Sequence, residues 1–431
     1  MIHSGILDIL KIYKKNIKDD EFVYPNYGSF SLAEIVPTIL AYFNINQERN
    51  EFAKSFFPKQ SSGRKILLFL VDGLSYSHFV KNYDKSIFFN SLALNGDVFP
   101  ITSVFPSTTP AALTTIHTGL TPQEHGLPEW TVYFEEFDKV IETLPFRPIL
   151  TRAKDTLMMF GGHPELLYKG QTIYQTLKDN SIPSYIFVSQ EHSLSTFSSI
   201  MHKGATSIYF TSIEDLFEKL LSIMIKTNGD AYLFVYWGNI DSVAHLFGPE
   251  GIEYANAVND FSKNISNLFL SKISKEIAEK FIILLTSDHG QSSINENEII
   301  YLNDYNWLED NYTKSPSLKW IPPTGGCHNV FLFIKEDKIQ ETIIRLEKEL
   351  YGKARIILIT DALLDGLFGL NNPSKRFLKR IGNILILPNK GFHVWYKYSS
   401  TKKFSQLGTH GGLSNEEMII PFAVAKLENI L

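Results

Sequence analysis

Three short, uninterrupted apolar runs lie far apart in the chain, and each gives way to polar residues. They are Ile66–Val71, Ala231–Trp237 and Phe281–Thr286. Runs of this kind are typical of strands buried on both faces of a parallel sheet. Between them, apolar residues recur at helical spacing in Thr172–Lys178, in Ile213–Ile225 and from Glu250 to about Leu270. This alternation predicts an α/β protein whose mostly parallel sheet is covered by helices on both faces.

The segment from residue 291 to 407 has a different pattern. An amphipathic stretch, Lys338–Leu350, precedes three short strand-like runs, Ala354–Ile359, Ile384–Leu387 and Phe392–Tyr396. We interpret this segment as an inserted α+β cap or lid. Residues 1–290 and 408–431 then form the core. Near the N-terminus, the short apolar run Ile6–Tyr13 predicts a surface helix.

Composition and charge narrow the class of protein. The 431 residues include 41 Lys and Arg against 46 Asp and Glu, a net charge of −5, which argues against a general nucleic-acid or anionic-membrane surface. The single cysteine, Cys327, excludes an intramolecular disulfide and suits a reducing compartment. We recognise no signal peptide and no apolar run near the roughly 20 residues that span a bilayer. We therefore expect a cytoplasmic protein with neither membrane nor duplex nucleic acid as partner, and an oligomeric state that the sequence does not indicate.

Polar residues follow each of the three predicted strands, where ligands of open parallel sheets bind. Asp72 follows the first strand, Asp241 and His245 follow the second, and Asp288 and His289 follow the third. The four-residue spacing of Asp241 and His245 places both side chains on one helical face, where they can reach one cation. Taken singly, a turn or a surface Asp–His pair explains each feature. Together they indicate a site for a metal ion.

Two further residues belong to the same pattern. Thr109 precedes Pro110 at the start of a helix-compatible stretch, where free backbone N–H groups favour a phosphate. A threonine hydroxyl at its normal pKa is a poor nucleophile, so this use requires a metal ion. His410 lies late in the chain in a glycine-rich loop, GTHGGL. Each residue also has a purely structural explanation. Thr109 would cap the N-terminus of the helix, and His410 would be part of an ordinary glycine-rich loop.

The ordered set of motifs resembles the alkaline phosphatase superfamily, in its type I phosphodiesterase / nucleotide pyrophosphatase branch. The motifs that carry the resemblance are LFLVDG, FPSTTPAALTTIHTGLTPQEHGL, NIDSVAHLFGP, TSDHGQ and GTHGGLSNEEMIIPF, and they span roughly Lys65 to Phe422. The resemblance implies a three-layer α/β/α sandwich that holds two divalent metal ions, usually zinc. Ligands of mixed oxygen and nitrogen type also fit manganese.

The resemblance also implies a role for each matched residue. One metal would be bound by Asp241, His245 and His410, and the other by Asp72, Asp288, His289 and the oxygen of Thr109. Thr109 would attack the phosphate and form a phospho-threonine intermediate in two-metal phosphoryl transfer. We choose Thr109 because it lies ten residues before Gly119, as the nucleophile of the branch does, and Thr108 is the second choice.

The chain departs from the branch at one position. Trp130 stands where these enzymes usually carry an asparagine that donates a hydrogen bond to the phosphate. The sequence therefore leaves three functions open: a phosphodiesterase or nucleotide pyrophosphatase, a phosphomonoesterase or phosphonate hydrolase, and a non-catalytic binding protein. The expected ligand is a small phosphate ester such as a nucleotide.

Two further sets of residues are candidates for contacts with a ligand. Trp130 and Tyr133 are candidates for stacking on a base. A basic cluster that we interpret as a solvated helix face is formed by Lys375, Arg376, Lys379 and Arg380.

Overall fold

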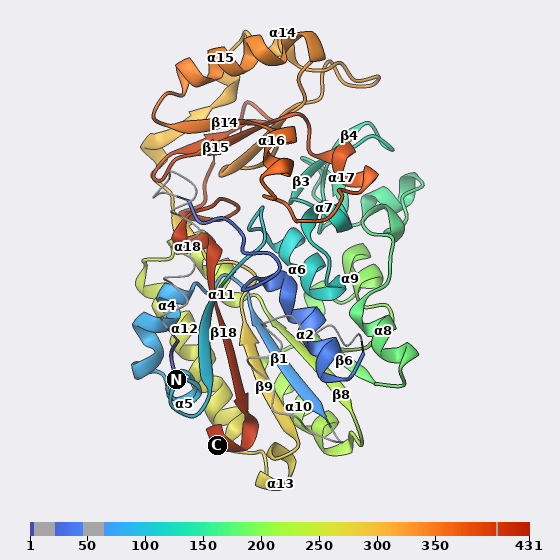
Figure 1. Ribbon diagram of the computed structural model, residues 1–431, viewed down its shortest axis with the longest axis vertical. Helices are drawn as coiled ribbons and strands as arrows, with labels where there is room; N and C mark the ends of the chain where they lie inside the picture. The colour runs from blue at the N-terminus through green and yellow to red at the C-terminus, as the bar shows by residue number, and fades with distance from the viewer. Residues whose placement is uncertain (4–21, 46–63, 402–403) are drawn as a thin grey trace.

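The computed structural model describes residues 1–3, 22–45, 64–401 and 404–431. A seven-stranded sheet in the order β2-β18-β9-β1-β8-β6-β7 forms its centre (Figure 1). These strands are Asp97–Thr102 (β2), Ile419–Lys426 (β18), Phe281–Thr286 (β9), Lys65–Val71 (β1), Ala231–Trp237 (β8), Ser184–Ser189 (β6) and Thr206–Phe210 (β7). The pairings from β9 through β1, β8 and β6 to β7 are parallel, and only β18 runs antiparallel to its neighbours. The prediction of a mostly parallel sheet is confirmed.

Helices cover both faces of this sheet, because alternate side chains of each strand point to opposite sides. On β1, Ile66, Leu68 and Leu70 pack with α2 (Ile35–Tyr42), α6 (Thr109–Thr118), α8 (Ile173–Asp179) and α9 (Thr196–Met201). Its other side chains, Leu67, Phe69 and Val71, pack with α4 (Tyr76–Asn82), α5 (Ile87–Asn95), α10 (Ile213–Lys226) and α12 (Ile252–Asn264). The core is therefore a three-layer α/β/α sandwich, as expected.

The apolar runs of the sequence correspond closely to observed elements. The three predicted strands are β1, β8 and β9, and the predicted helices are α8, α10 and α12, the last continued by a π-helical turn at Ile265–Leu270. Strands β2, β6, β7 and β18 are not among those predicted from the sequence. The proposed helix at Ile6–Tyr13 lies outside the described residues. Among the described helices, none has the length and apolar character needed to cross a membrane.

A second, antiparallel sheet lies within residues 291–407, above the core in Figure 1. Its strands are β12 (Thr324–Gly326), β13 (Asn329–Leu332), β15 (Ile384–Pro388) and β14 (Ala354–Leu358), with α15 (Ile339–Glu349) packed beside them. A short parallel pair joins β16 (His393–Trp395) to β11 (Ile299–Tyr301). We call residues 291–407 the cap segment, and its division from the core stays a prediction.

A two-stranded sheet joins the ends of the cap segment, and a three-stranded sheet of the core lies against β12 of the cap segment. The two ends of the segment meet where β10 (Ser292–Ser293) pairs with β17 (Gly408–Thr409), directly before His410. A three-stranded hairpin sheet, β3 (Thr131–Phe134), β4 (Lys139–Glu142) and β5 (Arg147–Pro148), follows the loop after α7 (Pro122–His125). These connections place both the loop of His410 and Trp130 near the carboxyl ends of the central strands.

Candidate active site

The first group of candidate ligands lies at the ends of two adjacent central strands. Because Leu70 of β1 is paired with Thr286 of β9, Asp72 and Asp288 lie at the same level, each two residues further on. His289 follows Asp288, and its Nε2 atom lies 3.6 Å from Asp72 Oδ1 and 3.3 Å from Asp288 Oδ2. All three residues are buried, with relative exposure of 1% or less. Sheet register alone thus brings them together.

The second group lies beside the first and draws its members from a helix and a loop. Asp241 and His245 lie on α11 (Asn239–Phe247), and His245 Nε2 is 3.4 Å from Asp241 Oδ2. His410 follows β17, and its Nε2 lies 3.8 Å from Asp241 Oδ1. The rings of His410 and His289 stack with their centroids 3.6 Å apart, so the two groups are in direct contact.

Thr109 is the first residue of α6, and its side chain meets the first group. Its hydroxyl Oγ1 lies 3.1 Å from His289 Nε2. Thr108 occupies the N-cap position, and its hydroxyl is buried without a hydrogen-bond partner. The seven residues singled out from the sequence therefore converge on one place, with Thr109 in direct contact with the first group.

The three histidines share one tautomer. Nδ1 of His245 donates to the Gly408 carbonyl at 2.8 Å, Nδ1 of His410 to the Ser107 carbonyl at 2.9 Å, and Nδ1 of His289 to the Gly290 carbonyl at 3.0 Å. A carbonyl oxygen can only accept, so the proton of each neutral ring resides on Nδ1. Every Nε2 is left as a lone-pair donor facing the carboxylates, which is how metal-bound imidazoles are oriented by their surroundings.

The electrostatics of the site favour a bound cation. Burial raises the pKa of Asp72 well above its usual value, and the neighbouring carboxylates of Asp288 and Asp241 raise it further. Burial likewise raises the pKa of Asp288 to about 7. Asp72 Oδ1 and Asp288 Oδ2 are buried and lack hydrogen-bond partners. Buried, crowded carboxylate oxygens without partners fit a divalent cation, because a cation supplies the charge that burial otherwise disfavours.

Two supporting residues escaped the sequence analysis. Tyr236 donates a hydrogen bond from its hydroxyl to Asp72 Oδ2, and Gln291 Nε2 donates to both the carboxylate and the carbonyl of Asp241. Gln291 belongs to the TSDHGQ motif, and Tyr236 is the penultimate residue of the second apolar run. Both residues therefore lie within segments that the sequence marks as important. Only the folded chain shows that their polar atoms reach the site.

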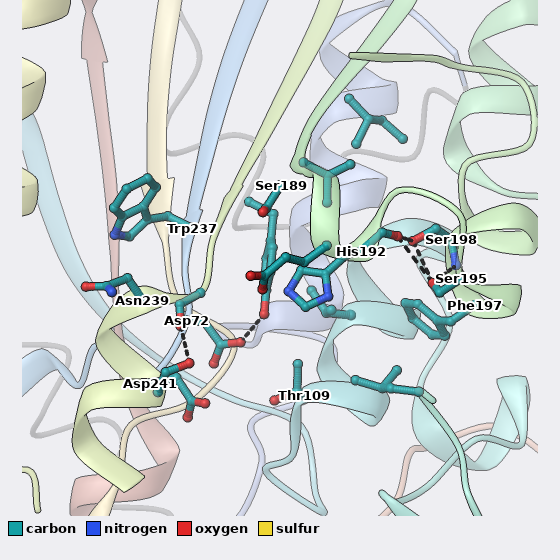
Figure 2. Close-up of a pocket in the computed structure, with 18 of the residues that line it drawn as sticks. Asp72, Thr109, Ser189, His192, Ser195, Phe197, Ser198, Trp237, Asn239 and Asp241 are labelled. Carbon is teal, nitrogen blue, oxygen red and sulfur yellow. Dashed lines mark hydrogen bonds between the residues drawn. The ribbon is translucent and has the colours of Figure 1, made fainter. Parts of the chain in front are cut away.

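Two cavities meet at Thr109. The strand-end compartment has a volume of about 580 Å³, and its walls include Phe197, Trp237, His192 and Lys154. Figure 2 shows it, with Asp72, Thr109 and Asp241 on one side and Ser195, Phe197 and Ser198 on the other. The cap compartment has a volume of about 530 Å³ and lies between the core and residues 395–399 and 404–406 of the cap segment. Thr109, Trp130 and Asp241 line both compartments.

The two aromatic residues that are candidates for stacking on a base lie in different surroundings. Trp130 is 41% exposed and stands between the two compartments, in contact with the site. Tyr133 is buried, donates to Asp138 Oδ1 and packs edge-on against Phe333, so it lines neither compartment. Of the two, only Trp130 is placed to contact a ligand.

The basic cluster on α17 (Lys375–Arg380) is not a solvated face throughout, and that interpretation is wrong for half of it. Arg380 is buried and donates to the carbonyls of Gly126 and Leu166 at 2.7 and 2.6 Å. Arg376 donates to the Glu165 carbonyl at 2.9 Å. The helix therefore fastens the loop after α7 to the rest of the core, because guanidinium groups satisfy several carbonyls at once.

A third group of ligand-type side chains lies in the cap segment, at Cys327, His328 and His393. The Asn295 amide donates to His393 Nε2 at 3.1 Å, so the His393 proton is on Nδ1, which faces His328 Nε2 at 2.7 Å. His328 then donates from Nδ1 to Glu417. Both imidazoles are thus committed to a hydrogen-bonded chain that joins the cap segment to α18 (Asn415–Met418).

Comparisons with solved structures support the fold. The fold is similar to that of human ectonucleotide pyrophosphatase / phosphodiesterase 5, with a TM-score of 0.60 and 20% identity over 84% of this chain and 87% of the other. An inactive variant of the murine protein in complex with AMP is similar with a TM-score of 0.59 and 18% identity, over 84% and 87% of the two chains.

Curated relatives match over shorter segments. Human ectonucleotide pyrophosphatase/phosphodiesterase family member 5 is 24% identical over 28% of this chain and 26% of its own length. The bis(5'-adenosyl)-triphosphatase of Xenopus laevis is 23% identical over 44% of this chain and 37% of its own. The matched parts therefore cover less than half of these relatives.

The family model for type I phosphodiesterase / nucleotide pyrophosphatase matches residues 66–413, which is most of the chain. The chain belongs to the type I phosphodiesterase / nucleotide pyrophosphatase family, a branch of the alkaline phosphatase superfamily.

Proposed function

We propose that this protein hydrolyses phosphodiester or pyrophosphate bonds of small phosphate esters, with nucleotides among its substrates. The observation that carries the proposal is the position of Thr109 Oγ1, 3.1 Å from His289 Nε2, at the point where a buried and a half-buried ligand group and two cavities meet. Family membership supports the reaction class, and AMP bound to the murine neighbour supports a nucleotide ligand.

We propose that each ligand group holds one divalent metal ion. Asp241, His245 and His410 would hold one, and Asp72, Asp288, His289 and Thr109 would hold the other. The donor set of carboxylate oxygens and imidazole nitrogens fits Zn²⁺, with Mn²⁺ as the second choice. When bound, such ions lower the pKa of a coordinated hydroxyl and neutralise negative charge on oxygens of the phosphate.

The residues of the chain then supply orientation. The Thr109 hydroxyl gives up its proton to solvent, and Oγ1 forms a bond to phosphorus while the bond to the leaving oxygen breaks on the opposite side. The products are a phospho-threonine and the leaving alcohol or phosphate, whose oxygen takes up a proton from water. Water subsequently attacks the same phosphorus and releases Thr109. The N-terminus of α6 faces this phosphorus with its free N–H groups and positive dipole, which stabilise the negative oxygens. Tyr236 and Gln291 hold two of the aspartates in place.

The test is hydrolysis of an aryl phosphodiester by the purified protein. We expect activity to be lost on chelation and restored by zinc or manganese, and elemental analysis to find two metal ions per chain. Thr109→Ala should abolish turnover, whereas Thr108→Ala, the matched neighbour, should retain the metal content and most of the rate. Full activity of Thr109→Ala would remove the nucleophile from the proposal.

Trp130 supports a second candidate, a phosphomonoesterase or phosphonate hydrolase. Trp130 stands in the sequence where the family pattern has a phosphate-binding asparagine, and its side chain lines both compartments. An indole cannot make the contacts that an amide makes to the phosphate, so these contacts would differ from the family pattern. Rates with an aryl monoester and an aryl diester under identical metal loading separate the two candidates. We expect the diester to react faster, because two compartments are present for two substituents.

A further inference from the structure

The cap compartment is adjacent to one side of the phosphate position. The nucleophile Thr109 contacts the group of Asp72, Asp288 and His289, so an in-line displacement expels the leaving group towards the group of Asp241, His245 and His410. All three residues of that second group line the cap compartment. The strand-end compartment is lined by Asp241 but by neither histidine. The leaving group would therefore lie on the side of the cap compartment. The retained group, which stays bonded to phosphorus, would lie on the other side.

The walls of the cap compartment are mainly flat and apolar. The core contributes Trp130, Ile149 and Leu150, and the cap segment contributes Trp395, Tyr398 and Phe404. The Trp395 and Phe404 rings meet edge-on with centroids 5.2 Å apart, and Trp395 and Tyr398 are also nearly perpendicular, at 6.5 Å. The Tyr398 hydroxyl is held by the Pro323 carbonyl at 2.6 Å. Trp395 is half-buried, so part of its ring is free to contact a ligand.

The charges along this compartment do not favour a strongly anionic leaving group. Beyond the site residues, the charged side chains among its described lining are Glu129, Glu142 and Lys397. Glu142 forms an ion pair with Arg147, and the Lys397 ammonium lies 3.5 Å above the Tyr301 ring. Burial raises the pKa of Glu129 to about 7. A pyrophosphate placed there would meet two carboxyl groups and one cation that is already engaged.

We propose that the cap compartment is a leaving-group subsite for an uncharged, planar, aromatic alcohol, and that Trp395 is its specificity-determining residue. The proposal rests on the function proposed above and goes beyond it, because it assigns separate compartments to the two substituents. The retained group occupies the strand-end compartment, where Lys154 and His192 line the wall. Contact between Trp395 and a planar leaving group resembles base stacking on an aromatic side chain, and its loss corresponds to about a tenfold change.

The experiment compares two substrates that share one retained group. The 4-nitrophenyl ester of thymidine 5′-phosphate releases an aromatic alcohol, and thymidine 5′-triphosphate releases pyrophosphate, while thymidine 5′-phosphate is retained in both. We expect Trp395→Ala to lower kcat/KM for the aryl ester about tenfold and to change the triphosphate reaction less than twofold. His192→Ala, on the wall of the other compartment, should change both reactions by the same factor. Tyr351→Ala removes an aromatic side chain of the cap segment that is 87% exposed, and it is the control for unspecific effects.

Binding gives a readout that does not depend on turnover. Calorimetry with the aryl ester should show an affinity about tenfold weaker for Thr109→Ala/Trp395→Ala than for Thr109→Ala alone. Equal affinity of these two variants, or an equal effect of Trp395→Ala on both substrates, would overturn the subsite. Absence of any ester hydrolysis by the unmodified protein would instead overturn the proposed function, and the calorimetric difference would still support an aromatic site at Trp395.

Discussion

Gly73 offers a sharp test of how closely the two ligand groups are packed. It follows Asp72 directly, has a φ of +76°, and a Cβ atom added to it would lie 2.8 Å from the Cα of Asp241. Its N–H donates to Asp288 Oδ1 at 3.2 Å, and its carbonyl accepts from the Tyr254 hydroxyl at 2.9 Å. One methyl group at this position therefore presses on the backbone between both groups.

The size of the effect follows from these distances. Ordinary contacts begin near 3.4 Å, so Asp241 and Gly73 must separate by about 0.6 Å in Gly73→Ala. Displacements approaching 1 Å cost catalysis about a hundredfold, so we expect kcat/KM to fall at least tenfold. The positive φ costs about 1–2 kcal/mol of unfolding free energy, and the contact adds about 1–3 kcal/mol.

The control is Gly229→Ala. Gly229 has a similar φ of +70°, and a Cβ atom there would meet nothing within 4 Å. It therefore shares the backbone cost but not the contact. Urea unfolding, metal content and kcat/KM are measured for both variants. If Gly73→Ala binds metal, folds and turns over as well as Gly229→Ala, the close packing of the two ligand groups is not required for function.

Three further predictions concern residues around the site. Burial lowers the pKa of His125 to about 3, so its neutral form stabilises the fold above pH 6.5 and that stability is lost as the pH falls from 6.5 towards 3. Between pH 7 and 5.5, the free energy of unfolding measured in urea should therefore fall by about 1.3 kcal/mol less in His125→Asn than in the unmodified protein. Arg380→Ala should destabilise the fold by about 3 kcal/mol, because two buried charge-assisted hydrogen bonds are lost, without changing KM for charged substrates. The exposed Lys379→Ala should cost less than about 1 kcal/mol in the same unfolding assay, and an equal loss would contradict the structural role of Arg380. Tyr236→Phe should weaken metal retention or kcat/KM about tenfold, since it removes the hydrogen bond to Asp72, and unchanged values in competition with a chelator would argue against that role.

The sequence predicts those elements of this protein whose burial can be recognised from the pattern of apolar residues within the element itself. β1, β8 and β9 are buried on both faces, so their apolar runs are continuous and their ends mark Asp72, Asp241 and Asp288. Strands such as β7, with exposed and half-buried positions, and β2, which contains Pro100, lack this signal. The site residues were found because motif order carries information that single residues lack.

Long-range contacts account for what the sequence did not reveal. The partner of Asp72 is Tyr236, 164 residues away, and Arg380 reaches a carbonyl 254 residues away. No local periodicity encodes either contact. The prediction of a solvated face for α17 was wrong for the same reason. A run of basic residues indicates an exposed face unless carbonyl groups distant in the sequence accept hydrogen bonds from its side chains. Here the accepting carbonyl groups lie in the loop after α7 and in the segment before α8.

The strand that completes the sheet comes late in the chain. β18 separates β2 from β9 and is hydrogen-bonded to both, so until residues 419–426 have been synthesised each of those strands presents an open edge. His410 lies only nine residues before this strand. During translation, His410, the last of the proposed metal ligands, is therefore made shortly before the strand that covers these two edges. A ribosome stalled before this point would carry a nascent chain that is both inactive and prone to associate with its neighbours.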